Sequence, residues 1–140
     1  MKLDWFKAYV ESLLRDMWDG HAHTDDDGDW PFRHGTAACW VAVRPYPRWR
    51  VEVFAHAASE LKQSARLLRE LNEANSNLVD GRIYWRGGLV VVETSLAADL
   101  VDARSLFAAC MTVGSAADDL GALLAAMFDG STPYLAEVGA

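Results

Sequence analysis

The segment from Arg82 to Glu93 constrains the fold most, because it predicts a tight β-hairpin. Gly87-Gly88 separates two β-prone runs, and paired glycines supply the positive φ angles that a two-residue hairpin turn needs. Arg82 to Arg86 is the first predicted strand, and Leu89 to Glu93, rich in β-branched residues, is the second. Strands joined by so short a turn must run antiparallel. We therefore expect an antiparallel sheet and not a parallel, doubly wound one.

Helical periodicity precedes this hairpin. The apolar stripe comprises Leu61, Ser64, Leu67, Leu68, Leu71, Ala74 and Leu78. Asn72, Asn75, Ser76 and Asn77 mark its C-terminal end, where short polar side chains compete with the helical backbone. Asn72 and Asn75 are expected to bond the exposed carbonyls there. Asp80-Gly81 then predicts a turn into the first hairpin strand.

A first helix is predicted from Leu3 to Trp18, with apolar residues at steps of three and four. Trp5 and Tyr9 lie one turn apart on a neighbouring edge of this helix. They either widen its core face or form a surface that meets a partner or a second copy of the chain.

A last, long helix is predicted from Ala103 to Phe128, with Asp102 as its N-cap. Its apolar stripe comprises Leu106, Cys110, Val113, Ala117, Leu120, Leu124 and Met127. Gly114 and Gly121 make part of this surface small, although glycine costs up to about 1 kcal/mol in a helix interior. They indicate close approach, either to the sheet or to another helix.

Three strands are predicted between the first two helices: Trp30 to Arg33, Thr36 to Val43, and Arg48 to His56. Pro31 fits an edge strand because it has no N–H to donate. The third strand alternates, so one face should lie under helices and the other should carry charges beside Phe54. The predicted order is α-βββ-α-ββ-α, an α+β fold with one antiparallel sheet.

The composition fits one domain over residues 1–140, with a core from about 3 to 128 and a loose tail from 129 to 140. The chain has 140 residues, of which 51% are hydrophobic, and a net charge of −7. An acidic chain repels phosphate backbones, so no nucleic-acid partner is expected. No apolar run approaches the roughly 20 residues of a membrane span, and the N-terminus has no signal-peptide pattern, so a cytoplasmic protein without a membrane partner is expected.

Sequence motifs typical of catalytic or metal sites are few in this chain. Cys39 and Cys110 are interpreted as reduced, buried residues that pair only if the fold brings them together. No phosphate loop, nucleophile motif or paired zinc motif occurs, and His56 has no nucleophile beside it. His21, His23 and the acidic run Asp25 to Asp29 leave a metal site as an alternative, although their spacing matches no calcium loop. We expect a protein that is not an enzyme and needs no cofactor.

Three segments carry a family resemblance: Asp25 to Arg33, Leu68 to Asn75, and Gly81 to Trp85. Their order and spacing resemble the type III secretion (CesT-like) chaperone fold and the related YbjN family, especially its actinobacterial members, from Asp25 to about Phe128. One departure is Arg86-Gly87-Gly88, which replaces an acidic turn. The resemblance implies a small acidic cytoplasmic protein, often a homodimer, that binds an extended segment of a client protein.

The leading hypothesis is therefore a peptide-binding, chaperone-like homodimer whose acidic surface favours basic clients. Its predicted peptide-binding aromatic residues are Trp30, Phe32, Trp40, Trp49 and Phe54. Two alternatives remain: an adaptor that binds one folded partner through Trp5 and Tyr9, and a metal-binding protein that uses the loop from His21 to Asp29.

Overall fold

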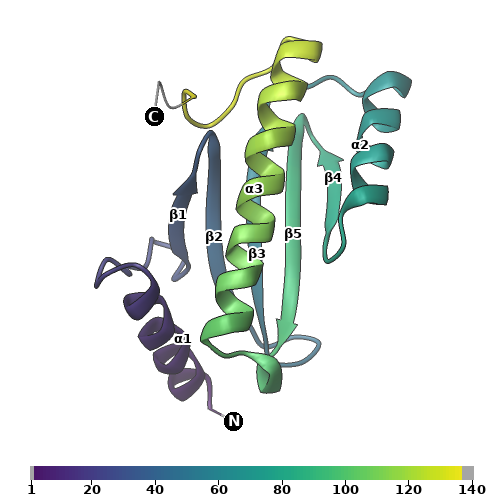
Figure 1. Cartoon of the computed structure of the whole chain (residues 1–140). Helices are drawn as coiled ribbons and strands as arrows, with labels where there is room; N and C mark the ends of the chain where they lie inside the picture. Colours follow the sequence, from purple (N-terminus) through teal and green to yellow (C-terminus); the bar gives the residue numbers. More distant parts are fainter. Residues whose placement is uncertain (1, 137–140) are drawn as a thin grey trace.

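The computed structural model describes residues 2–136 and confirms the α+β class, with one antiparallel sheet and three α-helices (Figure 1). The elements are α1 (Leu3–Met17), β1 (Trp30–His34), β2 (Ala37–Arg44), β3 (Arg50–Ala58), α2 (Ala65–Asn77), β4 (Arg82–Arg86), β5 (Leu89–Ala97), the short 3-10 helix η1 (Ala98–Leu100) and α3 (Ala103–Phe128). The five strands lie in the order β1-β2-β3-β5-β4, and every neighbouring pair is antiparallel.

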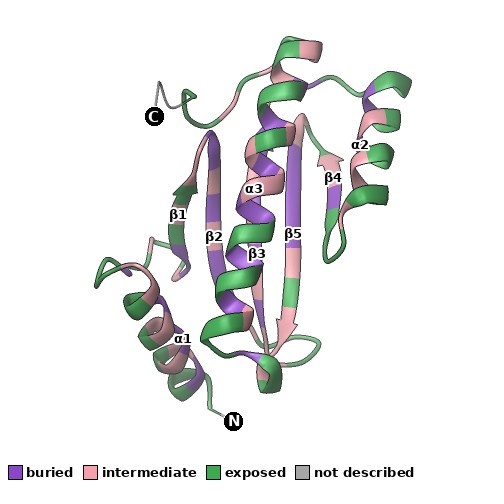
Figure 2. Cartoon of the chain, in the orientation of Figure 1, coloured by how far each residue is buried: buried purple, intermediate pink, exposed green. Residues whose placement is uncertain are grey.

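Helix α3 runs along the middle of one face of the sheet, with α1 on one side of it and α2 beside β4 on the other (Figure 1). The alternation predicted for β3 is confirmed, because Val51, Val53 and Ala55 are buried on this side (Figure 2). The opposite face of the sheet carries no helix in the described part of the chain. We call it the open sheet face.

Helix α3 begins at the predicted N-cap. Ser105 N donates to the Asp102 carboxylate (2.8 Å), and Asp102 N donates to Ser105 Oγ (3.0 Å), which together form a capping box. A Cβ at Gly121 would overlap the carbonyl of Ala57, and one at Gly114 would lie 2.6 Å from the ring of His34. The small residues therefore bring α3 close to the sheet, and not to another helix.

The same helix corrects one sequence-based expectation. Ala103–Phe128 is, by length and composition alone, long and apolar enough to cross a membrane, whereas the sequence analysis expected no segment of that kind. Such a length and composition also fit a core helix, and in this fold Leu106, Val113 and Leu124 are buried on the sheet side.

The start of the middle helix and the end of the hairpin were also predicted wrongly. Ser64 is not part of the apolar stripe but is the N-cap of α2, and it accepts a hydrogen bond from Leu67 N (3.0 Å). Leu61 is buried outside the helix, whereas Leu68 is 42% exposed. Strand β5 continues four residues beyond the predicted end, to Ala97, because this extension still pairs with β3.

Part of the expected tail is held against the sheet. Ser131 pairs with Ser59 in an isolated β-bridge, and Tyr134 N donates to Thr36 O (3.1 Å). The guanidinium of Arg33 lies 4.5 Å from the centroid of the Tyr134 ring. Residues 137–140 of the expected tail lie outside the described residues.

Candidate functional site

The open sheet face presents a group of aromatic rings. Trp40 is opposite Phe54 in the register of β2 and β3, and their rings stack with centroids 5.2 Å apart. His56 lies 4.6 Å from the Trp40 ring, and burial lowers the pKa of this histidine below its ordinary value. All three rings are half-buried although no described helix covers them. They form a flat apolar surface on which another chain can pack.

Arginines surround these rings. The register places Arg33, Arg44, Arg50, Arg82 and Arg86 on the open sheet face. Arg44 binds Asp29 through two hydrogen bonds (3.1 and 3.3 Å), and Arg50 binds Glu52 at 2.9 Å.

A buried carboxylate, Glu93, lies at the β4 side of the same face. Arg82 pairs with it, and the Tyr84 hydroxyl donates to Glu93 Oε2 (3.1 Å). Desolvation, together with the charge of Glu93, raises the pKa of Tyr84. The guanidinium groups of Arg82 and Arg86 lie 5.4 and 5.3 Å from the Tyr84 ring centroid, so Tyr84 contacts two cations.

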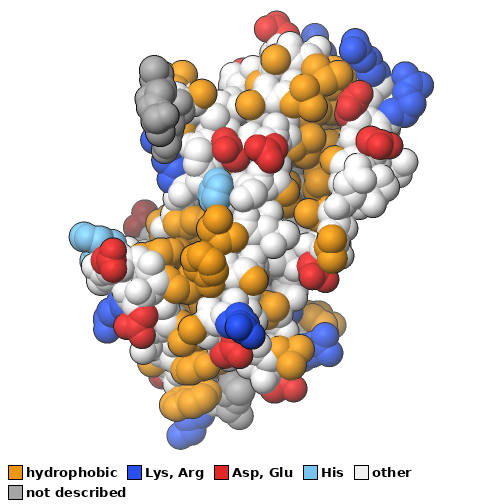
Figure 3. Space-filling view, viewed as in Figure 1, with side chains coloured by type: hydrophobic (Ala, Val, Ile, Leu, Met, Phe, Trp, Pro, Cys, Tyr) orange, Lys and Arg blue, Asp and Glu red, His pale blue; other side chains and the backbone are white. Residues whose placement is uncertain are grey.

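The helical side carries two apolar grooves, which Figure 3 shows as orange areas on either side of α3. The α1–α3 groove is lined by Met17, Trp18, Phe32, Arg33, His34, Phe107, Cys110 and Met111. Trp18 and Phe32 contact each other in it, with ring centroids 5.3 Å apart. The α2–α3 groove is lined by Ala74, Asn77, Leu78, Ile83, Ala116, Asp119, Leu120 and Leu123. Leu123 is 50% exposed there.

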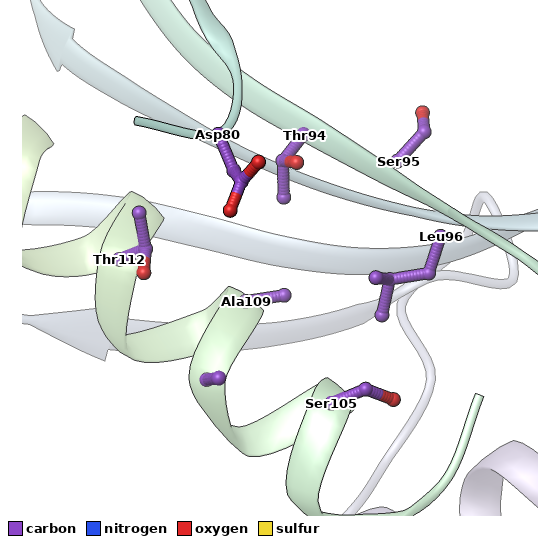
Figure 4. Close-up of a pocket in the computed structure, with 8 residues that line it drawn as sticks. Asp80, Thr94, Ser95, Leu96, Ser105, Ala109 and Thr112 are labelled. Atoms are coloured by element: carbon purple, nitrogen blue, oxygen red, sulfur yellow. The ribbon is translucent and has the colours of Figure 1, made fainter. Parts of the chain in front are cut away.

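A pocket of about 320 Å³ lies between α3 and the end of β5 (Figure 4). Its lining includes Asp80, Thr94, Ser95, Ser105 and Thr112, although the Ser95 hydroxyl points away from it and accepts a hydrogen bond from Arg50 (Figure 4). A second pocket lies beyond β5, toward the open sheet face; its lining includes Asp80, Arg50, Glu52, Arg82 and Glu93, and it shares Thr94 and Ser95 with the first.

The five aromatic residues predicted to bind peptide do not form one site. Trp40 and Phe54 lie on the open sheet face, and Phe32 lies in the α1–α3 groove. Trp30 is only 2% exposed, and its indole N–H donates to Glu11 (3.3 Å), so it has no surface for a client. Trp49 packs edge-on against Phe6 beside the core.

Sequence reasoning missed Phe107 and Met111. They are four residues apart on α3 and off its apolar stripe, a spacing that indicates a second apolar face.

The predicted partner residues of α1 have separate roles. Trp5 is 60% exposed and stacks on Tyr9, with ring centroids 5.8 Å apart. The Tyr9 hydroxyl donates to the carbonyl of Val101 (2.9 Å), so Tyr9 joins α1 to the start of α3. Trp5 is the exposed member of the pair.

In the acidic loop from His21 to Asp29, the carboxylates of Asp25 and Asp29 bind groups of the protein itself. Asp25 Oδ1 accepts hydrogen bonds from the backbone N–H groups of Asp27 and Asp29, each at 3.0 Å. The carboxylate of Asp29 is occupied by Arg44, while His21 and His23 are exposed. Among residues 2–136, no group of three metal-binding side chains is arranged to hold an ion.

The two cysteines are buried free thiols, and burial raises the pKa of each to about 12.

Comparison with known families decides the relationship. Residues 4–135 match the family model described as T3SS (YopN, CesT) and YbjN peptide-binding chaperone 1, TY-Chap1. The chain belongs to this family. The resemblance inferred from the sequence is therefore confirmed, and the match extends through α1 as well as the segments that indicated it.

A solved structure supports the TY-Chap1 fold independently. A chain in the crystal structure of the ExsC–ExsE complex is similar to this one with a TM-score of 0.68 at 14% sequence identity. The similarity covers 89% of this chain and 97% of that chain. No curated protein matches the sequence significantly.

Proposed function

We propose that this TY-Chap1 protein is a non-enzymatic, chaperone-like protein that binds an extended segment of a client protein, as a homodimer in the cytoplasm. Family membership supports the class of function. The observation that carries the proposal is the uncovered aromatic surface of Trp40, Phe54 and His56 on the open sheet face. Flat aromatic rings bury much area at low entropic cost when a peptide packs on them.

The arginines around these rings add polar recognition. An extended peptide exposes carbonyl groups that arginine N–H groups can bind. Arg86 is exposed and has no ion pair among the described residues, so its guanidinium is available for such a contact. Arg44, Arg50 and Arg82 are held in place by carboxylates, which keeps this part of the surface rigid. A rigid surface loses little conformational entropy when a client binds.

The test is peptide binding. Random 12-residue peptides are selected on the wild-type protein, and the dissociation constant of each selected peptide is measured by fluorescence anisotropy. We expect the double variant Trp40→Ala, Phe54→Ala to raise the dissociation constant about tenfold or more, as the removal of well-packed aromatic contacts does. Trp5→Ala is the control, because it removes an exposed tryptophan of α1 that is not on this face.

Two results would contradict the proposal. One is a wild-type protein that selects no peptide at all. The other is a folded double variant that binds the selected peptides as tightly as the wild type does.

A further inference from the structure

Strand β5 is longer than the strand that pairs with it at the sheet edge. β4 has five residues and β5 has nine, and their pairing ends at Arg82 and Glu93. Thr94 to Ala97 therefore pair with β3 on one side and with no strand of residues 2–136 on the other. We call the unpaired side of Thr94 to Ala97 the β5 gap.

Backbone groups of β5 point into the β5 gap. Ala98 N donates to Trp49 O (3.1 Å), which continues the pairing of β5 with β3. Alternate residues of an antiparallel strand direct their N–H and C=O groups to opposite sides. Ser95 and Ala97 therefore direct theirs away from β3, where a new strand could bind them.

The outer edges of β1 and β4 are blocked. Edge strand β1 contains Pro31, which has no N–H to offer an incoming strand. On β4, the side chain of Asn75 accepts from Ile83 N (2.8 Å) and donates to Ile83 O (2.7 Å), so it takes the place of a neighbouring strand. Neither device occurs at the β5 gap.

The two pockets flank this gap on opposite faces of the sheet. The pocket of Figure 4 lies on the α3 side, the second pocket lies on the other, and Thr94 and Ser95 line both. A strand that adds to a sheet edge directs successive side chains to opposite faces. The pockets thus lie where alternate side chains of an added strand would go.

We propose that a client segment adds to β5 at this gap as a short extra strand, with its side chains alternating between the two pockets. The proposal rests on the proposed function, since it states where and how the client backbone binds. Four residues of β5 are available, so the added strand is short.

The charge of the site indicates the chemistry of the client. Asp80 lines both pockets and is exposed, and its carboxylate has no hydrogen-bond or ion-pair partner among the described residues. It is the one ionisable side chain that lines the pocket of Figure 4. In the second pocket, Arg50 and Arg82 are already paired with glutamates. The client segment is therefore expected to carry a lysine or arginine that binds Asp80.

The main test is Ala97→Pro. Ala97 has φ −59°, which proline adopts without strain, and its N–H points away from β3. Proline there removes that N–H and places a ring in the gap while leaving the pairing with β3 intact. The matched control is Ala103→Pro, because Ala103 is the first residue of α3, where proline is well tolerated.

Both proline variants, and Asp80→Asn, are tested with the 12-residue peptides selected on the wild type. We expect Ala97→Pro to raise the dissociation constant about tenfold or more, through one lost hydrogen bond plus steric exclusion. Ala103→Pro is expected to bind like the wild type. Asp80→Asn should weaken binding only of peptides that contain lysine or arginine, by roughly three- to tenfold.

The outcomes separate this proposal from the proposed function. If the wild type selects no peptide, the proposed function fails and this proposal fails with it. If folded Ala97→Pro binds normally while Trp40→Ala, Phe54→Ala does not, strand addition at the gap is wrong and the proposed function stands. If Ala97→Pro instead converts a dimer to a monomer, the gap holds a second copy of the chain and the client proposal is overturned.

A second measurement covers the case in which Ala97→Pro does not fold. Amide exchange of the wild type is followed by NMR with and without a saturating selected peptide. Slower exchange of the Ser95 and Ala97 amides supports strand addition, and unchanged exchange of both overturns it.

Discussion

Gly114 and Gly121 lie two turns apart on the same side of α3, but they face different neighbours. At Gly121 an added Cβ would meet the backbone carbonyl of Ala57, which cannot move without displacing β3. At Gly114 it would meet the ring of His34, a side chain that can rotate away. A side chain at Gly121 should therefore cost more stability than one at Gly114, although both glycines occupy similar positions in the sequence pattern of the helix.

We expect Gly121→Ala to lower the free energy of unfolding by about 1–3 kcal/mol, the cost typical of overpacking, despite alanine's higher helix propensity. Gly114→Ala should cost less. The exposed variant Ala122→Gly gives the effect of propensity alone, a loss of about 1 kcal/mol. Urea denaturation measures all three, and a Gly121→Ala protein more stable than the wild type would refute the close approach of α3 to the sheet.

Single residues also show what sequence patterns can predict. Asp102 was predicted as an N-cap, because capping depends on residues three positions apart. The burial of Trp30 was not predicted, since it depends on packing with α1, including the contact with Glu11, which is 19 residues away. The sequence suggested five binding aromatics, but it could not separate a core tryptophan from the exposed stack of Trp40 and Phe54.

At the scale of elements, one side chain of α2 forms hydrogen bonds with the edge of the sheet, in addition to the apolar packing of Leu67 and Leu71. The sequence led us to expect Asn72 and Asn75 to bond the carbonyls at the end of their own helix. Asn75 instead bonds both backbone groups of Ile83 in β4, while Asn72 is exposed. This role could not be predicted, because it requires knowing that α2 lies beside β4.

We expect Asn75→Ala to lower the free energy of unfolding by about 1–3 kcal/mol, because it removes two hydrogen bonds and leaves the N–H and C=O of Ile83 unpaired. Asn72→Ala is the matched control and should change stability by less than about 0.5 kcal/mol. Amide exchange at Ile83 is the specific readout. Unchanged exchange in Asn75→Ala would show that α2 is held to β4 by other contacts.

At the scale of the whole molecule, the class and order of elements followed from the sequence because they depend on periodicity and turn residues. The two grooves and the β5 gap did not, because each is made by segments that are distant in the chain. The end of β5 is an example. Thr94 and Ser95 have the polarity of a connector, but pairing with β3 extends the strand through them.

Self-association is the remaining prediction at this scale. We expect light scattering over a dilution series to give the mass of a homodimer. Leu123→Glu should convert it to a monomer if the α2–α3 groove is the dimer contact, because a charge would then be buried among apolar side chains. Leu100→Glu, at another exposed leucine outside this groove, is the control. A wild type that is monomeric at every concentration would contradict the dimer and leave client binding to be judged by its own test.

The bond between Asn75 and Ile83 also relates this structure to chemical ageing. Asparagine amides hydrolyse slowly to carboxylates, and asparagine is one of the thermolabile residues of proteins. A carboxylate here would still accept from the N–H of Ile83 but would have no hydrogen to donate to its carbonyl, so two oxygens would face each other. In older molecules α2 would thus be held to β4 less firmly than in new ones. Molecules with the same sequence would come to differ in this attachment as they age.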